Sequence, residues 1–208
     1  NGQKRIILHA EDFLRYNALG IKVDRKAVLD LFKAVTKIEG VENVSPSHFA
    51  LASVASEPEL LGEISNIVGD KGGPWLSGQT GVETGSPKII EKHMPGKVLP
   101  FKPKDWPDIV EQAFGICKDS GWTPCGTLVI GLPGEDEDDI NKTIELMDRI
   151  KDYKSLIVPL FFVPIGNLTG DRGFTVDDMK DYHWRLVLKC WNHGMRWAEV
   201  LSKEYVDR

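Results

Sequence analysis

The sequence has no apolar run near the roughly 20 residues that a membrane-spanning helix needs, which argues against a membrane protein. It also lacks an excess of positive charge: the net charge of −5 over 208 residues argues against a dominant nucleic-acid surface. Cysteine is scarce, and the three residues are Cys117, Cys125 and Cys190. Their odd number and wide separation argue against a disulfide framework and predict a reducing, cytoplasmic environment. They also lack the close spacing of a zinc or iron–sulfur loop.

Short apolar segments alternate with segments of helical periodicity along the chain. With 41% hydrophobic residues, the chain can form one substantial core. We expect strands at residues 5–9, 44–54, 75–82, 127–130 and 155–163, with helices between them and a long final helix from residue 175. Strands that are separated by helices form parallel βαβ units, so this pattern predicts an α/β layer or barrel. Right-handed crossovers would place the carboxyl ends of all strands at one rim.

The clearest unit of this kind runs from Thr123 to Ile150. The β-branched run at residues 127–130 predicts a buried strand, and Gly-Leu-Pro-Gly at 131–134 predicts a tight turn. Carboxylates from Glu135 to Asp139 then suit the start of an amphipathic helix. Because α/β folds bind ligands at the carboxyl ends of parallel strands, this turn predicts a binding edge.

Polar side chains follow the other predicted strands at the same end. Hydroxyls and a carboxylate crowd around two glycines after the third strand, a set that suits ribose hydroxyls or an amino-acid head group. Two carboxylates after the first strand either face a ligand or form a solvated junction, and a histidine in the second strand is either a ligand or a hydrogen-bonded core residue. The candidate residues are Glu11, Asp12, His48, Glu83, Thr84 and Ser86, and residues 131–135 and 162–167 would converge with them.

Two segments resemble motifs of the radical S-adenosylmethionine (SAM) superfamily. Gly-Val-Glu-Thr-Gly-Ser-Pro at 81–87 is similar to a segment on the fourth barrel strand in that superfamily. Leu-Val-Ile-Gly-Leu-Pro-Gly-Glu at 128–135 is similar to the segment of the fifth strand, together with its Asp-rich helix start at 136–143. Residues 9–16 resemble the second strand end in the branch whose members often carry a cobalamin-binding domain.

The resemblance covers about residues 4–166 and implies a partial (β/α)6 TIM-like barrel. The implied fold class is α/β, with parallel strands two to six of the barrel in residues 1–172 and a helical extension in residues 173–208. The superfamily reduces SAM with a [4Fe–4S] cluster that three cysteines hold in a C-x-x-x-C-x-x-C loop, and this sequence contains no such loop. We therefore expect a fragment, inactive in isolation, whose first strand and cysteine loop would lie before Asn1.

The resemblance also implies a chemistry and roles for single residues. The chemistry is reductive cleavage of SAM to a 5′-deoxyadenosyl radical that acts on an unknown substrate, and the use of cobalamin is left open. Carboxylates at the first strand would lie near the amino group of SAM, the polar residues after the third strand near its ribose or methionine, and residues of the last two strands along its adenine. The respective residues are Glu11 and Asp12; Glu83, Thr84 and Ser86; and Ile130 and Gly131 with the backbone of Phe162 and Val163. Glu135 is interpreted as a helix-start acid.

Two other interpretations stay open at this point. One is an ordinary TIM-like or doubly wound enzyme whose turn at 131–134 cradles a phosphate, although this turn lacks the Lys-Ser/Thr of a P-loop. The other is a non-catalytic binding domain that docks through its Trp-rich final helix. An incomplete barrel would also expose the edges of its second and last strands, so we expect dimerisation, strand swapping or coverage by the final helix.

Overall fold

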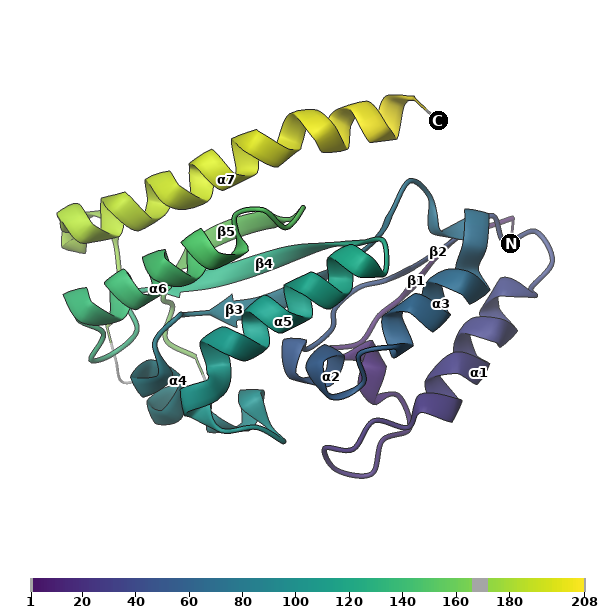
Figure 1. Ribbon diagram of the computed structural model, residues 1–208, viewed down its shortest axis with the longest axis horizontal. Coiled ribbons are helices and arrows are strands. Elements are labelled where there is room, and N and C mark those ends of the chain that lie inside the picture. The colour runs from purple at the N-terminus through teal and green to yellow at the C-terminus, as the bar shows by residue number, and fades with distance from the viewer. Residues whose placement is uncertain (1, 166–171, 208) are drawn as a thin grey trace.

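The computed structural model describes residues 2–165 and 172–207, which form an α/β fold with parallel strands (Figure 1). The strands are β1 (Arg5–Leu8), β2 (Asn43–Pro46), β3 (Leu76–Glu83), β4 (Trp122–Ile130) and β5 (Leu156–Phe161). The α-helices are α1 (Arg25–Thr36), α2 (Leu51–Ser56), α3 (Leu60–Val68), α4 (Pro87–His93), α5 (Trp106–Asp119), α6 (Glu137–Ile150) and α7 (Asp181–Val206). Short 3₁₀ helices are η1 (Phe13–Arg15), η2 (Gly69–Gly72), η3 (Pro95–Val98), η4 (Pro103–Asp105) and η6 (Val176–Asp178). The predicted α/β class is confirmed.

The strands pair in chain order. β1 pairs with β2 in one parallel sheet, and β3, β4 and β5 form a second parallel sheet in that order. Backbone bonds join the two sheets beyond the end of β2, where Gln79 donates to the Ser47 carbonyl at 2.8 Å and accepts from the Phe49 amide at 3.0 Å. All five strands therefore run in the same direction, with their carboxyl ends toward one edge.

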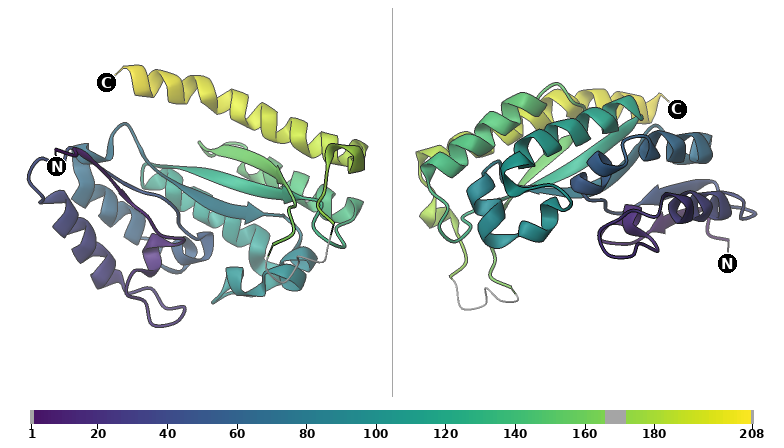
Figure 2. Two further views of the ribbon diagram at one scale, coloured as in Figure 1. Left: turned by 180° about the vertical axis from the view of Figure 1, so that it is seen from behind. Right: turned by 60° about the horizontal axis from the view of Figure 1, so that its bottom comes forward.

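Helices cover one face of the strands. Helices α1 to α6 lie in front of the strands in Figure 1, and the view from behind in Figure 2 shows the strands with no described helix across them. The last helix, α7, packs against α6 and the edge strand β5. Side chains of β3 alternate accordingly, since Thr80 and Val82 are buried toward the helices whereas Gln79 is exposed on the other face.

The core lies between the strands and the helices. Aromatic rings join the first two βα units to the rest: Phe13 stacks on Trp122 with ring centroids 5.7 Å apart, and Phe49 meets Trp122 edge-on at 5.8 Å. From α5, the fully buried Trp106 donates its indole N–H to the carbonyls of Val82 and Thr84, so it holds the end of β3.

Three sequence-based boundaries are wrong. The final helix was expected from residue 175, but α7 begins at Asp181, after η6 and an extended Lys180. The second strand was expected at 44–54, but β2 ends at Pro46 and α2 begins at Leu51. The apolar residues of α2 from Leu51 to Ala55 are all buried. The sequence there shows no alternation of apolar and polar residues that would distinguish a strand from a helix. The fourth strand was expected from 127 and begins at Trp122. Asn167, which ended the expected rim, lies outside the described residues.

Pro159 lies within the edge strand β5, as an edge position allows, and pairs in register with Leu128. Within the described ranges, no helix combines the length and apolarity that crossing a membrane requires.

Candidate functional site

The carboxyl ends of β3, β4 and β5 lie side by side, as the sequence predicted. Glu83 at the end of β3 is in register with Leu128 of β4, and Ile130 at the end of β4 is in register with Phe161 of β5. The next amide, that of Phe162, donates to the Ile130 carbonyl at 2.9 Å. This edge therefore gathers the segments that carry both sequence motifs.

Glu83 is the most unusual residue at this edge. Its φ angle is +62°, a left-handed conformation that is rare for residues with a Cβ, and the register between β3 and β4 shifts at this position. The Glu83 carboxylate accepts from the Lys97 ammonium at 2.9 Å, and both side chains are largely buried. A Cβ on Gly81 would overlap the Glu83 carboxylate and the Lys97 ammonium, so a side chain at position 81 would displace this ion pair from its present position. Strained residues of this kind cluster at functional sites.

The two hydroxyls after Glu83 face away from the edge. Thr84 and Ser86 are buried, and both side chains bond to α6. The Thr84 hydroxyl lies 3.2 Å from that of Thr143, and the Ser86 hydroxyl donates to Asp139 at 2.6 Å. Thr84 and Ser86, which the resemblance implies as ligand contacts, thus use their hydroxyls in hydrogen bonds within the protein.

The two motifs form one packed joint between the β3–α4 loop and α6. A Cβ on Gly85 would lie 2.5 Å from the Lys142 carbonyl oxygen and 2.7 Å from the Thr143 Cα. The Gly85 amide also donates to the Thr143 hydroxyl at 2.9 Å. Because the loop backbone approaches the helix so closely, a side chain at position 85 would force the two apart. The joint explains why glycine, hydroxyls and acids occur together in these motifs.

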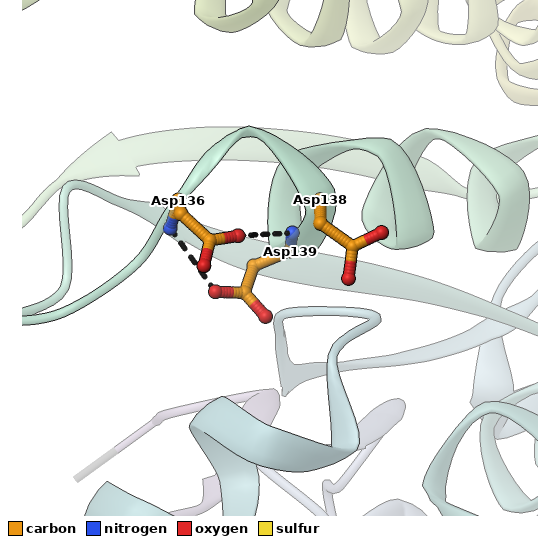
Figure 3. Close-up of side chains that lie close together, drawn as sticks. All are labelled: Asp136, Asp138 and Asp139. Atoms are coloured by element: carbon orange, nitrogen blue, oxygen red, sulfur yellow. Dashed lines mark hydrogen bonds between the residues drawn. The ribbon is translucent and has the colours of Figure 1, made fainter.

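Three carboxylates gather at the start of α6, those of Asp136, Asp138 and Asp139 (Figure 3). Asp136 and Asp139 form a capping box in which each side chain accepts from the other residue's amide, at 3.1 and 3.0 Å. The Lys88 ammonium lies 2.8 Å from Asp136 and 2.6 Å from Asp139. Hydrogen bonding from Lys88 lowers the pKa of Asp136 to about 2. The cluster is thus a capped helix start whose negative charge is partly offset by Lys88 and by Lys142, which pairs with Asp138 at 2.5 Å.

Glu135, interpreted from the sequence as a helix-start acid, lies before α6 and folds back onto the glycine turn. Its Oε2 accepts from the Gly131 amide at 2.7 Å, while Oε1 is buried with no hydrogen-bond partner in residues 2–165 and 172–207. Burial raises the pKa of Glu135 to about 7, against the Gly131 hydrogen bond, which lowers it. The amide that could cradle a phosphate is therefore already bound to an internal carboxylate, which weakens the phosphate interpretation. Sequence reasoning undervalued Glu135 because nothing in its pattern indicates burial.

Three residues assigned to the adenine have other roles. Ile130 is fully buried in the core on the helix-covered side of β4. Gly131 has a φ of +86°, and Phe174 packs where its Cβ would be. Phe162 is buried, and its carbonyl accepts from the Phe174 amide at 3.0 Å, so both of its backbone groups are already bonded. The contacts of these residues to adenine that the resemblance implies stay a prediction. The Val163 side chain is exposed at the same edge.

At the end of β1, the two carboxylates differ. Glu11 is exposed. Asp12 accepts from the Ala50 amide at 3.2 Å and from the Ser53 hydroxyl at 2.6 Å, and it lies 3.3 Å from the Arg15 guanidinium. Burial raises the pKa of Asp12 despite these partners. Asp12 therefore ties η1 to α2, and of the two carboxylates only that of Glu11 is exposed to solvent.

His48 lies where the two sheets meet, next to Gln79 in a parallel bridge. Its ring contacts that of His9 edge-on, with centroids 5.8 Å apart. Its Nδ1 is buried and has no hydrogen-bond partner within the described part of the chain. His48 thus remains a candidate, because buried polar atoms in proteins are normally satisfied.

The cysteines do not form a cluster site. Cys117 on α5 and Cys190 on α7 are buried in the core, where burial raises the pKa of each thiol to about 12. Cys125 is half-buried on β4. Thiols that bind iron are deprotonated and close together, so these three do not fit a [4Fe–4S] cluster.

Comparison with models of known protein families finds no match to this chain, and comparison with curated proteins finds none either.

Proposed function

We propose that the chain is part of a radical SAM enzyme and that it binds the nucleoside of SAM at the carboxyl edge of β3, β4 and β5. The two sequence motifs support this proposal, since they adjoin one another at that edge and pack into a single joint through Gly85 and Thr143. The proposal concerns how these residues bind the nucleoside of SAM.

The arrangement of strands and helices is consistent with a sector of a (β/α) barrel. All five strands are parallel and follow one another in chain order, and helices lie on one face. In a barrel the other face of the strands lines the interior. Gln79 and the half-buried Cys125 lie next to one another in register on β3 and β4, and they would then face a substrate.

Glu83 is the single observation that carries the proposal. Its left-handed backbone directs the carboxylate over Gly81 at the strand end, and Lys97 holds it there. A carboxylate next to a strand end in an α/β fold commonly accepts hydrogen bonds from ribose hydroxyls. Thr84 and Ser86 no longer compete for this role, so we assign ribose binding to Glu83.

The iron–sulfur cluster of the superfamily has no ligands among this chain's cysteines. Cys117 and Cys190 are buried on different helices, and no group of three cysteine, histidine or acidic ligands other than the capped aspartates occurs in the described ranges. A cluster would need ligands from outside these 208 residues, and we derive no reaction step through it.

The proposal is tested by calorimetry with SAM, 5′-deoxyadenosine and adenine. We expect the chain to bind SAM and 5′-deoxyadenosine. Glu83→Gln should weaken both by at least about tenfold, because a hydrogen bond to a charged group contributes roughly 1.5–3 kcal/mol. Binding of adenine, which has no ribose, should not respond to the substitution.

The matched control is Glu91→Gln, the same chemical change on the exposed face of α4. Its affinity for 5′-deoxyadenosine should equal that of the unsubstituted chain. Absence of binding to either nucleoside at millimolar concentration would overturn the proposed function. Equal affinity of Glu83→Gln and Glu91→Gln would remove Glu83 from the site.

A further inference from the structure

β2 and β3 are joined only toward their carboxyl ends. Gln79 of β3 bonds to the backbone of Ser47 and Phe49, beyond the end of β2. Nearer the amino ends, the part of the chain that the structure describes contains no backbone bond between these two strands. A cavity of about 480 Å³ lies there, lined by residues of both strands. It opens at the amino edge of the strands, opposite the edge that carries Glu83.

This cavity combines polar and aromatic side chains. The polar ones come from β1, β2, β3 and η2, and the rings of Trp75 and Tyr205 come from just before β3 and from the end of α7. The two rings meet at 57° with centroids 6.4 Å apart, and the Lys154 ammonium lies 5.7 Å from the Trp75 centroid. Cavities that bind small molecules measure roughly 300–1,000 Å³ and combine aromatic side chains with a few polar groups. The cavity has both properties.

Two opposite charges line the cavity without pairing. Arg5 at the start of β1 and Asp70 on η2 form no ion pair or side-chain hydrogen bond within residues 2–165 and 172–207. They flank Asn43, which is in register with Arg5. On the other side, the Asn43 amide donates to the carbonyl of Lys71, the neighbour of Asp70, at 3.1 Å. A guanidinium and a carboxylate therefore both reach this cavity and stay separate.

The other polar side chains of the cavity carry no further unpaired charge. Glu42 pairs with Lys4 at 2.6 Å, and the Ser45 hydroxyl donates to Asn43 at 3.2 Å. The Ser77 hydroxyl has no partner among the described residues. A ligand would thus meet one cation, one anion, one free hydroxyl and an aromatic surface. Only a zwitterion can pair with both charges at once.

We propose that this cavity binds a free amino acid with a flat aromatic side chain. The ligand carboxylate would pair with the Arg5 guanidinium, which suits two-pronged recognition of carboxylates, and the ligand ammonium would pair with Asp70. The ligand ring would lie against Trp75 and Tyr205, because aromatic rings attract one another in offset or edge-on contact at about 4.5–7 Å between centroids.

This site is separate from the proposed nucleoside site. Ser77 lines the cavity, and Glu83 lies at the other end of the same strand. At roughly 3.3 Å per residue, the two positions are about 20 Å apart along β3. An aromatic amino acid and a nucleoside could therefore bind to one chain at the same time.

Ligands of other charge fit the cavity less well. A simple anion would pair with Arg5 but approach the carboxylate of Asp70, and a simple cation would do the reverse. A neutral sugar could accept from Arg5, donate to Asp70 and stack on Trp75, although it would leave both charges without a counter-charge. Neutral sugars are therefore the competing class of ligand, and the experiment includes one.

Calorimetry of the full 208-residue chain with L-tryptophan tests the proposal. We expect a dissociation constant of roughly a millimolar or below, as is usual for a ligand of this size. Tryptamine lacks the carboxylate, and indole-3-propionate lacks the ammonium. Each should bind roughly three- to tenfold more weakly than L-tryptophan, because each loses one charge-assisted hydrogen bond to a partly exposed partner.

Substitutions assign each charge of the ligand to its partner. In Arg5→Gln, L-tryptophan should bind no better than tryptamine, while its preference over indole-3-propionate persists. In Asp70→Asn, L-tryptophan should bind no better than indole-3-propionate, while its preference over tryptamine persists. Tyr205→Ala should weaken all three indole ligands by a similar factor. The matched control is Asp177→Asn, at an exposed residue of η6 that does not line the cavity, and it should bind all three as the unsubstituted chain does.

The proposal is overturned if L-tryptophan does not bind at about 10 mM. It is also overturned if Arg5→Gln and Asp70→Asn keep the same preferences as Asp177→Asn. Binding of glucose without binding of L-tryptophan would indicate a sugar site and reject the amino acid. Glu83→Gln should bind L-tryptophan with unchanged affinity, so this site can be confirmed even if the proposed nucleoside site fails. Competition between L-tryptophan and 5′-deoxyadenosine would overturn the assignment to this cavity.

Discussion

Glu83 offers a direct test of backbone strain at the proposed site. We compare two substitutions, Glu83→Gly and Glu83→Ala. Both remove the carboxylate that pairs with Lys97, so the loss of that ion pair cancels in the comparison. The two variants differ in the Cβ, which at a φ of +62° is the source of the strain. The difference in their free energies of unfolding therefore reports the strain, reduced by the greater freedom of glycine in the unfolded chain.

The expected difference favours glycine. A residue with a Cβ loses roughly 1–2 kcal/mol in the left-handed conformation, which glycine does not. Glycine in turn gains freedom in the unfolded chain, which costs about 0.4–1 kcal/mol relative to alanine. Glu83→Gly should thus be more stable than Glu83→Ala by about 0.5–1 kcal/mol. At an ordinary strand position the order is reversed, and glycine is less stable by roughly 0.5–1 kcal/mol.

Urea unfolding followed by tryptophan fluorescence and circular dichroism measures both values. The matched control is the same pair of substitutions at Gln79, an exposed residue of the same strand without a positive φ. Alanine should be the more stable variant there. If alanine is as stable as glycine at position 83, the left-handed conformation is not strained and the argument for a functional role of Glu83 loses its basis. Both Glu83 variants should lose ribose-dependent binding of 5′-deoxyadenosine, so the more stable of them gains nothing in function.

Two further predictions concern the joint and the glycine turn. Gly85→Ala should lower the free energy of unfolding by roughly 1–3 kcal/mol, because its methyl would meet backbone atoms of Lys142 and Thr143. Gly96→Ala, which meets nothing within 4 Å, is its control, and equal urea midpoints of these two variants would contradict the close approach. The pKa of Glu135 is about 7 in the folded protein, against 4.5 for an unperturbed glutamate. The folded protein therefore binds more protons than the unfolded chain between these two pH values. The free energy of unfolding should fall by up to about 3 kcal/mol as pH rises through this window. Glu135→Gln should lack this decrease in urea titrations at pH 4.5 to 8, whereas the exposed Glu137→Gln should keep it; the same slope in both variants would refute the buried carboxylate.

The common edge of the strand ends could be predicted from the sequence, but the direction of single side chains could not. Helical periodicity between apolar runs indicates parallel βαβ units, and parallel strands end at one edge, so the proximity of Glu83 and Ile130 follows from pattern alone. Which hydroxyls at that edge stay free depends on what packs against them. Thr84 and Ser86 are taken up by α6, whose Asp139 and Thr143 lie more than fifty residues further along the chain.

Burial is the property that the sequence conceals most. Glu135 stands in a run of acids that a helix start would explain, yet the turn folds it inward onto Gly131 while its neighbour Asp136 stays exposed. Asp12 likewise belongs to an exposed-looking pair with Glu11, but it is bonded to the start of α2. In both cases one carboxylate turns inward and its neighbour outward, a choice that depends on contacts with distant residues.

The sequence by itself determined the α/β class, the parallel order of the units, and the glycine-rich ends of β3 and β4, because local periodicity and glycine content act within a few residues. The tertiary structure alone decided that Glu83 is held by Lys97 over Gly81, that the other polar groups of the motifs bond to α6, and that β2 and β3 leave a cavity at their amino ends. These outcomes depend on long-range packing, in which each polar group bonds to whichever donor or acceptor the fold brings within about 3 Å, and sequence distance does not predict that partner.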